Sequence, residues 1–235
     1  MIVFLLILAI LPVILLGRYV YSKDKNKEPK KLLLGFFILG IMAAIITVGI
    51  SLVIDNFIPI FGIDESNLNP INLFIHVFFC IALIEELSKW IFTYLIGYNH
   101  KEFDEMYDMI VYAVFVALGF ACLENILYII GDGTVAVSIY RGLLSVPGHV
   151  CYGIFMGYYL AMAKFHNVAG NKQSERINKI KSLLIPIILH TVYDYCCFIK
   201  SNIFIIIFFV FIINLYILAH GKLKTTANMM AKLKK

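Results

Sequence analysis

The chain is 235 residues long, and 61% of its residues are hydrophobic against 15% charged. Its mean hydropathy of +0.88 excludes an ordinary soluble domain and is typical of polytopic membrane proteins. The net charge of +5 does not indicate a nucleic-acid partner, because the cations concentrate in short connections between apolar runs. All five cysteines fall within apolar segments, so neither a disulfide framework nor a CxxC metal site is expected.

Apolar runs of about 20 residues recur along the chain, and each is long enough to cross a bilayer as a helix. Seven spans are predicted, at residues 2–20, 32–56, 71–97, 108–130, 136–163, 182–199 and 202–220. The first lacks the basic start and the cleavage site of a secretory signal, so we interpret it as a span. The predicted fold class is all-α: a polytopic membrane protein with about seven transmembrane helices around a buried polar site. We expect one integral membrane domain over residues 1–235, with a motif-bearing core at about 71–199.

Lysine and arginine are distributed unevenly between the two sides that these spans define. Every second connection is basic, whereas residues 57–70 and 131–135 contain no Lys or Arg. The positive-inside rule therefore predicts a multi-pass protein of the cell membrane with an outside N-terminus and a cytoplasmic C-terminus. Residues 164–181, the largest cytoplasmic connection, are expected to form a solvated linker or a short surface helix.

The third span carries two adjacent acids and a lysine, Glu85, Glu86 and Lys89. Charged groups in the hydrocarbon layer are costly and by default face a partner or water. On a helix the two acids point about 100° apart, while Lys89 lies within reach of either. We expect one glutamate to be held by Lys89 and the other to face a cavity as a general base.

The fourth span places Glu124 in a stripe with Phe120 and Tyr128, at helical spacings of four residues. Glu124 is a candidate to polarise a water, to bind a cation or to accept a hydrogen bond from a histidine on the next helix. A purely structural alternative is a buried carboxylate held by a tyrosine or by Asn125.

The fifth and sixth spans each contribute a histidine with a neighbour one turn later. Gly153 leaves space beside His149, and Asp194 is placed to orient the ring of His190, as carboxylates do for catalytic or ligating imidazoles. Arg141, also in the fifth span, is predicted to pair with Asp132 or Asp194 or to contact a substrate.

Counting along each span suggests that these side chains share a depth. At 1.5 Å per residue from the cytoplasmic ends, Glu86 and His190 lie roughly 15 Å deep. Glu124, His149 and Asp194 lie roughly 20–24 Å deep by the same count. Tilted helices can therefore bring them into one centre that opens toward the outer side.

Four motifs occur in order: EELSK at 85–89, FACLENILY at 120–128, VPGHVCYGIFMG at 146–157 and HTVYD at 190–194. With them the chain resembles the PrsW family of intramembrane proteases, which is distantly related to the type II CAAX prenyl proteases. The resemblance implies an all-α bundle that makes the first, outer-side cut in a single-span anti-sigma factor during a stress response. It also implies that Glu85, Glu86 and the motif histidines are essential. Where the prenyl proteases have EExxxR and FxxxH motifs, this chain has Lys89 and Glu124.

The expected chemistry is hydrolysis of a peptide bond by a water that Glu86 or Glu85 deprotonates, with Glu124, His149, His190 and Asp194 completing the catalytic set. The histidines would either donate hydrogen bonds to the oxyanion or, with Glu86, bind a divalent metal such as zinc. Because no HExxH motif is present, a metal-independent mechanism is slightly preferred. Lys89, Asn125 and Arg141 are assigned supporting roles.

Three other functions use the same buried carboxylates: an ion-coupled transporter, a membrane lipid-amide hydrolase and a catalytically silent scaffold. Inverted repeats would favour the transporter, and the sequence contains none that we detect. The expected partners are a single-span membrane protein and membrane lipids.

Overall fold

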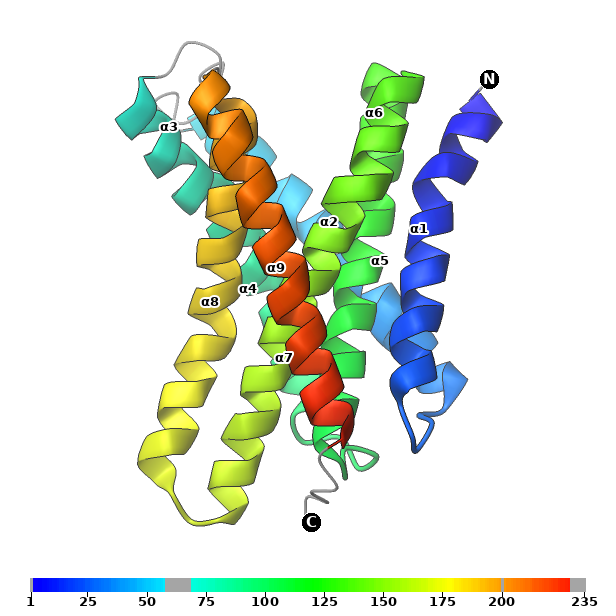
Figure 1. Cartoon of the computed structure of the whole chain (residues 1–235), viewed down its shortest axis with the longest axis vertical. Coiled ribbons are helices and arrows are strands. Elements are labelled where there is room, and N and C mark those ends of the chain that lie inside the picture. Colours follow the sequence, from blue (N-terminus) through cyan, green and yellow to red (C-terminus); the bar gives the residue numbers. More distant parts are fainter. Residues whose placement is uncertain (1, 58–68, 200, 229–235) are drawn as a thin grey trace.

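The computed structural model describes residues 2–57, 69–199 and 201–228, and in these residues the chain forms seven continuous helices in one bundle (Figure 1). We call the end of the bundle where the first helix begins the N-terminal face, and the end where the last helix finishes the C-terminal face. Two of the seven helices contain short π-helical segments. The elements are α1 (Ile2–Lys23), α2 (Lys30–Phe57), α3 (Pro70–His76) joined through Val77–Ala82 to α4 (Leu83–Phe92) and Thr93–Gly97, α5 (Met106–Asp132), α6 (Val135–Tyr140) joined through Arg141–Ser145 to α7 (Val146–Val168), α8 (Lys172–Phe198) and α9 (Asn202–Asn228).

Six helices of the described residues are long and apolar enough to cross a membrane. The remaining one, formed by α6 and α7, runs along the bundle beside them (Figure 1). Large apolar side chains on α1, α2 and α9 are exposed on the outside of the bundle, as expected of surfaces that face lipid. The predicted all-α polytopic membrane fold is confirmed.

The polar stretch 164–181 differs from the prediction. It is not a linker, because α7 continues to Val168 and α8 already begins at Lys172. The side chain of Asn171 caps α8 by accepting a hydrogen bond from the Ser174 amide, and Glu175 forms ion pairs along the same helix. The predicted loop at 57–70 lies almost entirely outside the described residues.

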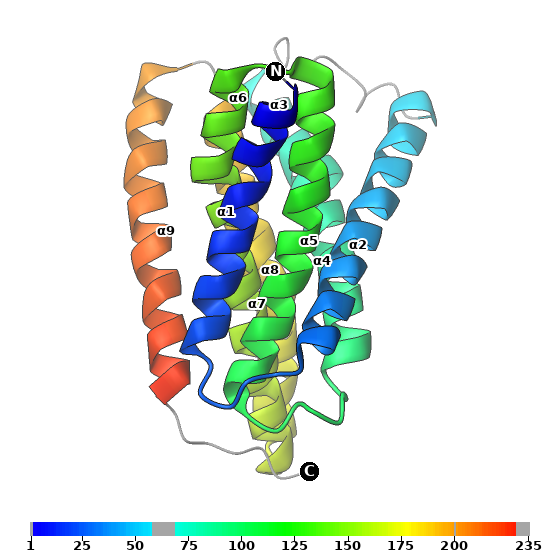
Figure 2. The same ribbon diagram turned by 90° about the vertical axis from the view of Figure 1, so that its right-hand side faces the viewer.

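Helix α5 occupies the centre, between α1 and α2 on one side and α7 on the other (Figure 2). A Cβ added to Gly119 would lie 1.9 Å from the carbonyl oxygen of Phe37, so α2 and α5 cross with their backbones in contact. Gly157 brings α7 against α5 in the same way, since its added Cβ would lie 2.5 Å from the Cα of Ile110. These close crossings fix the helices that carry the polar side chains.

Candidate active site

The predicted polar residues of separate helices meet in one buried place. Glu85 and Glu86 come from α4, His149 from α7 and His190 from α8, and one potential metal-ligating atom of each lies within 4.8 Å of the others. All four side chains are buried, Glu86 completely. π-Helical segments directly precede α4 and α7, a distortion that is frequent near functional sites. We call these four residues, together with Lys89, Glu124, Arg141 and Asp194, the site cluster.

Lys89 lies at the centre of the site cluster and is itself buried. Its Nζ is 2.6 Å from Glu86 Oε1, 3.5 Å from Glu85 Oε2 and 3.1 Å from His149 Nδ1. The same amine lies 4.0 Å from the centre of the Phe120 ring. An ammonium has three N–H donors and no acceptor, so each of its donors has one acceptor here. Lys89 therefore compensates the negative charge of the two adjacent glutamates.

His190 is held between carboxylates. Its Nδ1 is 2.9 Å from Glu86 Oε1, and its Nε2 is 3.1 Å from Asp194 Oδ2 and 4.0 Å from Glu85 Oε2. Carboxylates accept hydrogen bonds, so both ring nitrogens are satisfied when the imidazole carries both protons. Asp194 thus orients His190 from one turn away on α8, as their spacing predicts.

Glu124 is bound on both of its oxygens by side chains from the fifth membrane helix. His149 Nε2 is 2.8 Å from Glu124 Oε2, and an Arg141 terminal nitrogen is 2.8 Å from Glu124 Oε1. Because Lys89 donates to His149 Nδ1, the proton of that ring is on Nε2 and points at Glu124. Arg141 also donates to Asn125 Oδ1 at 2.8 Å and lies over the ring of Tyr128.

Of the alternatives predicted for Arg141, the pairing with Asp194 is wrong. Its guanidinium pairs with Glu124 rather than Asp194, because the α6–α7 helix packs on α5 and faces the side of α5 that carries Glu124. The side chain of Asp132, the other predicted partner, lies outside what the structure describes. Asn125 accepts a hydrogen bond from Arg141. It does not hold the Glu124 carboxylate, as the structural alternative predicted.

A cavity of about 500 Å³ adjoins the site cluster. Glu85, Glu124, Arg141, His149, His190 and Asp194 line it, together with tyrosines and apolar side chains of α6, α7 and α8. A second hollow of about 620 Å³ between α2 and α5 also reaches Glu85 and Glu124, and Thr47 and Ser51 line its far side. Glu86 and Lys89 line neither space. Glu85 is therefore the glutamate of the adjacent pair that faces open volume, from two directions.

Tyr152 is a site residue that the sequence did not single out. Its ring is buried, lines the cavity of about 500 Å³ and stacks on His190 with ring centres 5.0 Å apart. Its hydroxyl is buried without a hydrogen-bond partner among the described residues. A buried hydroxyl normally has a partner, so this one is free to bind a group that enters the cavity.

Comparisons with known proteins agree with this architecture. The family described as "PrsW family intramembrane metalloprotease" matches residues 28–219. Protease PrsW of Oceanobacillus iheyensis is 38% identical over 92% of this chain and 92% of its own length. Protease PrsW of Clostridioides difficile is 34% identical over 97% and 93%, and that of Bacillus subtilis is 36% identical over 82% of each chain.

No solved structure matches the chain significantly. The family match nevertheless covers most of the sequence, and the relatives share more than 30% of their residues with it over most of both chains. Within the matched range, the motif residues Glu85, Glu86 and His190 meet in the site cluster. On this evidence the chain belongs to the PrsW family of intramembrane proteases.

Proposed function

We propose that this protein hydrolyses a peptide bond of a membrane-protein substrate in the cavity beside Glu85. The observation that carries the proposal is that the two adjacent glutamates have different surroundings. Glu86 is enclosed by Lys89 and His190, whereas Glu85 faces the cavity. The two hollows that meet at Glu85 give an extended polypeptide a path through the site. We assign the protein to the cell membrane with its N-terminus outside, and its substrate class to single-span proteins such as an anti-sigma factor.

The charge balance of the site cluster supports Glu85 as the base. Its members are four carboxylates, two permanent cations and two imidazoles: Glu85, Glu86, Glu124, Asp194, Lys89, Arg141, His149 and His190. With His190 doubly protonated and His149 neutral, one negative charge remains uncompensated. Glu85 has the longest distances to its cations, 3.5 Å to Lys89 and 4.0 Å to His190, so that charge resides mainly on it.

In the proposed reaction Glu85 takes a proton from a water in the cavity while the water oxygen bonds to the scissile carbonyl carbon. The carbonyl oxygen becomes an oxyanion, to which the unpartnered Tyr152 hydroxyl donates a hydrogen bond. Collapse of the tetrahedral intermediate breaks the C–N bond, and protonated Glu85 returns its proton to the leaving amine. Lys89, His149 and His190 hold the surrounding carboxylates in place, since their nitrogens are engaged by side chains.

The donor atoms also fit a divalent metal in kind and in spacing. Glu86, His149 and His190, with Glu85, would hold it, and Glu86 Oε2 is buried without a hydrogen-bond partner in the described chain. Such an ion would supply Lewis-acid activation of the water or the carbonyl. We favour the metal-independent version, because Lys89 already binds the facing atoms of three of these four residues.

The test is cleavage of a single-span substrate by the purified full chain in proteoliposomes. We expect Glu85→Gln to lower the initial rate by about 1,000-fold, within the range that removal of a general base costs. Glu28→Gln is the matched control, since this buried glutamate lies at the C-terminal face, in the loop between α1 and α2, and should retain full activity.

Wild-type activity retained by Glu85→Gln would overturn the assignment of the base. Absence of any peptide cleavage by wild type, together with release of a fatty acid from a lipid amide, would replace the protease by a lipid hydrolase. Cation uptake driven by a proton gradient, without cleavage of either substrate, would favour the transporter.

A further inference from the structure

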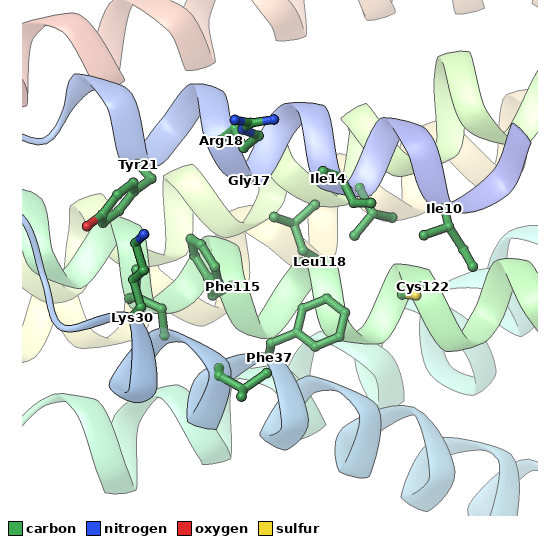
Figure 3. A pocket seen from close by; sticks show the side chains of 13 residues that line it. Ile10, Ile14, Gly17, Arg18, Tyr21, Lys30, Phe37, Phe115, Leu118 and Cys122 are labelled. Atoms are coloured by element: carbon green, nitrogen blue, oxygen red, sulfur yellow. The ribbon is translucent and has the colours of Figure 1, made fainter. Parts of the chain in front are cut away.

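A groove between α1 and α2, on the opposite side of α5 from α7, is separate from the site cluster (Figure 3). It has a volume of about 360 Å³. Its walls are apolar, with Ile10 and Ile14 on α1, Leu34 and Phe37 on α2, and its floor is formed by Phe115 and Leu118 of α5. At membrane depth such a groove faces the acyl chains of the bilayer.

The end of the groove nearest the C-terminal face is cationic. Arg18 of α1 and Lys30 of α2 line it from opposite walls, and Tyr21 of α1 lies beside Lys30 (Figure 3). Both cations are exposed, and neither makes an ion pair or hydrogen bond within the described residues. Tyr21 is already engaged, since its hydroxyl donates to the Glu28 carbonyl oxygen. Two unpaired positive charges thus line the same end of an apolar groove.

We propose that this groove binds one anionic phospholipid, with an acyl chain along α5 and the phosphate between Arg18 and Lys30. The groove from Arg18 to Ile10 is about 12 Å long at 1.5 Å per residue. That length is close to the ~15 Å hydrocarbon thickness of a single leaflet. The charge pattern therefore matches a lipid headgroup at the interface and its chain in the leaflet below.

The charge pattern favours a phospholipid over a transmembrane helix of another protein, because the two unpaired cations at one end of the apolar groove match a single headgroup phosphate. Gly17 lines the groove as well, and an added Cβ there would lie 3.2 Å from Leu118, so the groove is closed tightly against α5 at this point.

The test is native mass spectrometry of the delipidated full chain titrated with phosphatidylglycerol, phosphatidylcholine of the same acyl chains, or glycerol phosphate. Wild type should retain one phosphatidylglycerol in preference to phosphatidylcholine and should not retain glycerol phosphate. Each cation near an anionic lipid contributes about 1 kcal/mol, a factor of about five. We therefore expect Arg18→Gln/Lys30→Gln to weaken phosphatidylglycerol binding about 25-fold.

Two further variants separate this site from general attraction of lipid to a basic face. Lys31→Gln/Arg176→Gln removes the same charges from exposed positions outside the groove and should bind like wild type. Leu34→Trp fills the groove from a position that is 58% exposed, so it should fold normally and lose both phospholipids. Equal losses in the two charge variants, undiminished binding by Leu34→Trp, or competition by glycerol phosphate alone would overturn the proposal. The readout does not depend on proteolysis.

Discussion

Two groups of buried carboxylates in this protein are built differently. In the site cluster, cations from α4 and the α6–α7 helix bind Glu86 and Glu124. At the C-terminal face, in a group that we call the rim cluster (Asp24, Glu28 and Asp108), the partners are neutral. Tyr112 donates to Glu28 at 2.9 Å, while backbone amides donate to Asp24 and Asp108.

The difference shows that burial of an acid does not by itself mark chemistry. The carboxylates of Asp24 and Asp108 accept hydrogen bonds from the backbone of a turn and of a helix start, and Asp108 forms a capping box with Glu105. The site carboxylates instead depend on charges from other helices, and they lie beside a cavity. Removal of a partner of a buried carboxylate should therefore lower the free energy of unfolding strongly in the site cluster and only slightly in the rim cluster.

The largest effect is expected for Lys89→Met, which leaves Glu86 buried without its closest cation. Breaking a buried ion pair on one side costs about 3–5 kcal/mol. We expect a loss of that size in the free energy of unfolding in detergent micelles, and recovery of most of it in Lys89→Met/Glu86→Gln. The rim counterpart, Tyr112→Phe, should cost only about 1 kcal/mol. Equal losses in the two single variants would remove the distinction between the clusters.

The next largest effect concerns a neutral donor in the site. Tyr152→Phe keeps the ring that stacks on His190 but removes the unpartnered hydroxyl. The loss of one oxyanion donor should lower kcat about 100-fold, with KM and Tm unchanged. Tyr107→Phe, which removes a hydroxyl bonded to the Val20 carbonyl near the rim, serves as the control and should leave kcat unchanged. Full activity of Tyr152→Phe would contradict the assignment of Tyr152 as the oxyanion donor and would favour a histidine in that role.

The site contacts that the sequence predicted without alternatives are those whose partners lie on one helix, whereas the Glu124–His149 contact between helices was one of several alternatives. The contacts of Lys89 with Glu86 and of His190 with Asp194 follow from spacings of three and four residues. The pairing of Arg141 with Glu124 joins two helices, so no spacing rule along one helix reveals it.

Tyr152 and the buried state of Glu28 were missed for another reason. The chain contains 14 tyrosines, and nothing local distinguishes the one that stacks on a site histidine. Glu28 lies in a lysine-rich connection and reads as a solvated charge, yet the fold buries it against Tyr112 of α5. For the fold, the number and type of spans follow from composition. The close crossing of α2 and α5 instead depends on Gly40 and Gly119, which are far apart in the sequence and lie close together only in the folded protein.

A smaller effect is expected from the pH dependence of the rim. Burial raises the pKa of Glu28 to about 7, while the Tyr112 hydrogen bond opposes the shift. The folded state thus binds this proton more tightly than the unfolded state, so the contribution of Glu28 to stability is full below pH 4.5 and is lost as the pH rises through 7. We expect a decrease of about 1 kcal/mol, because the group lies at a face open to water. Glu28→Gln should remove this decrease from the plot of unfolding free energy against pH. An unchanged slope in the variant would show that Glu28 is not the group responsible.

The smallest expected effect is that of metal removal. The rim carboxylates are bound by groups of the chain alone, and in the favoured mechanism the central positive charge of the site also comes from the chain, from Lys89. Exhaustive treatment with a chelator should therefore change the initial cleavage rate less than twofold, and elemental analysis of the active protein should find less than one metal ion per chain. Loss of activity that zinc restores, with one zinc bound per chain, would contradict this expectation. Glu86, His149 and His190 would then be the ligands, and Lys89 would have to leave the position that it occupies between them.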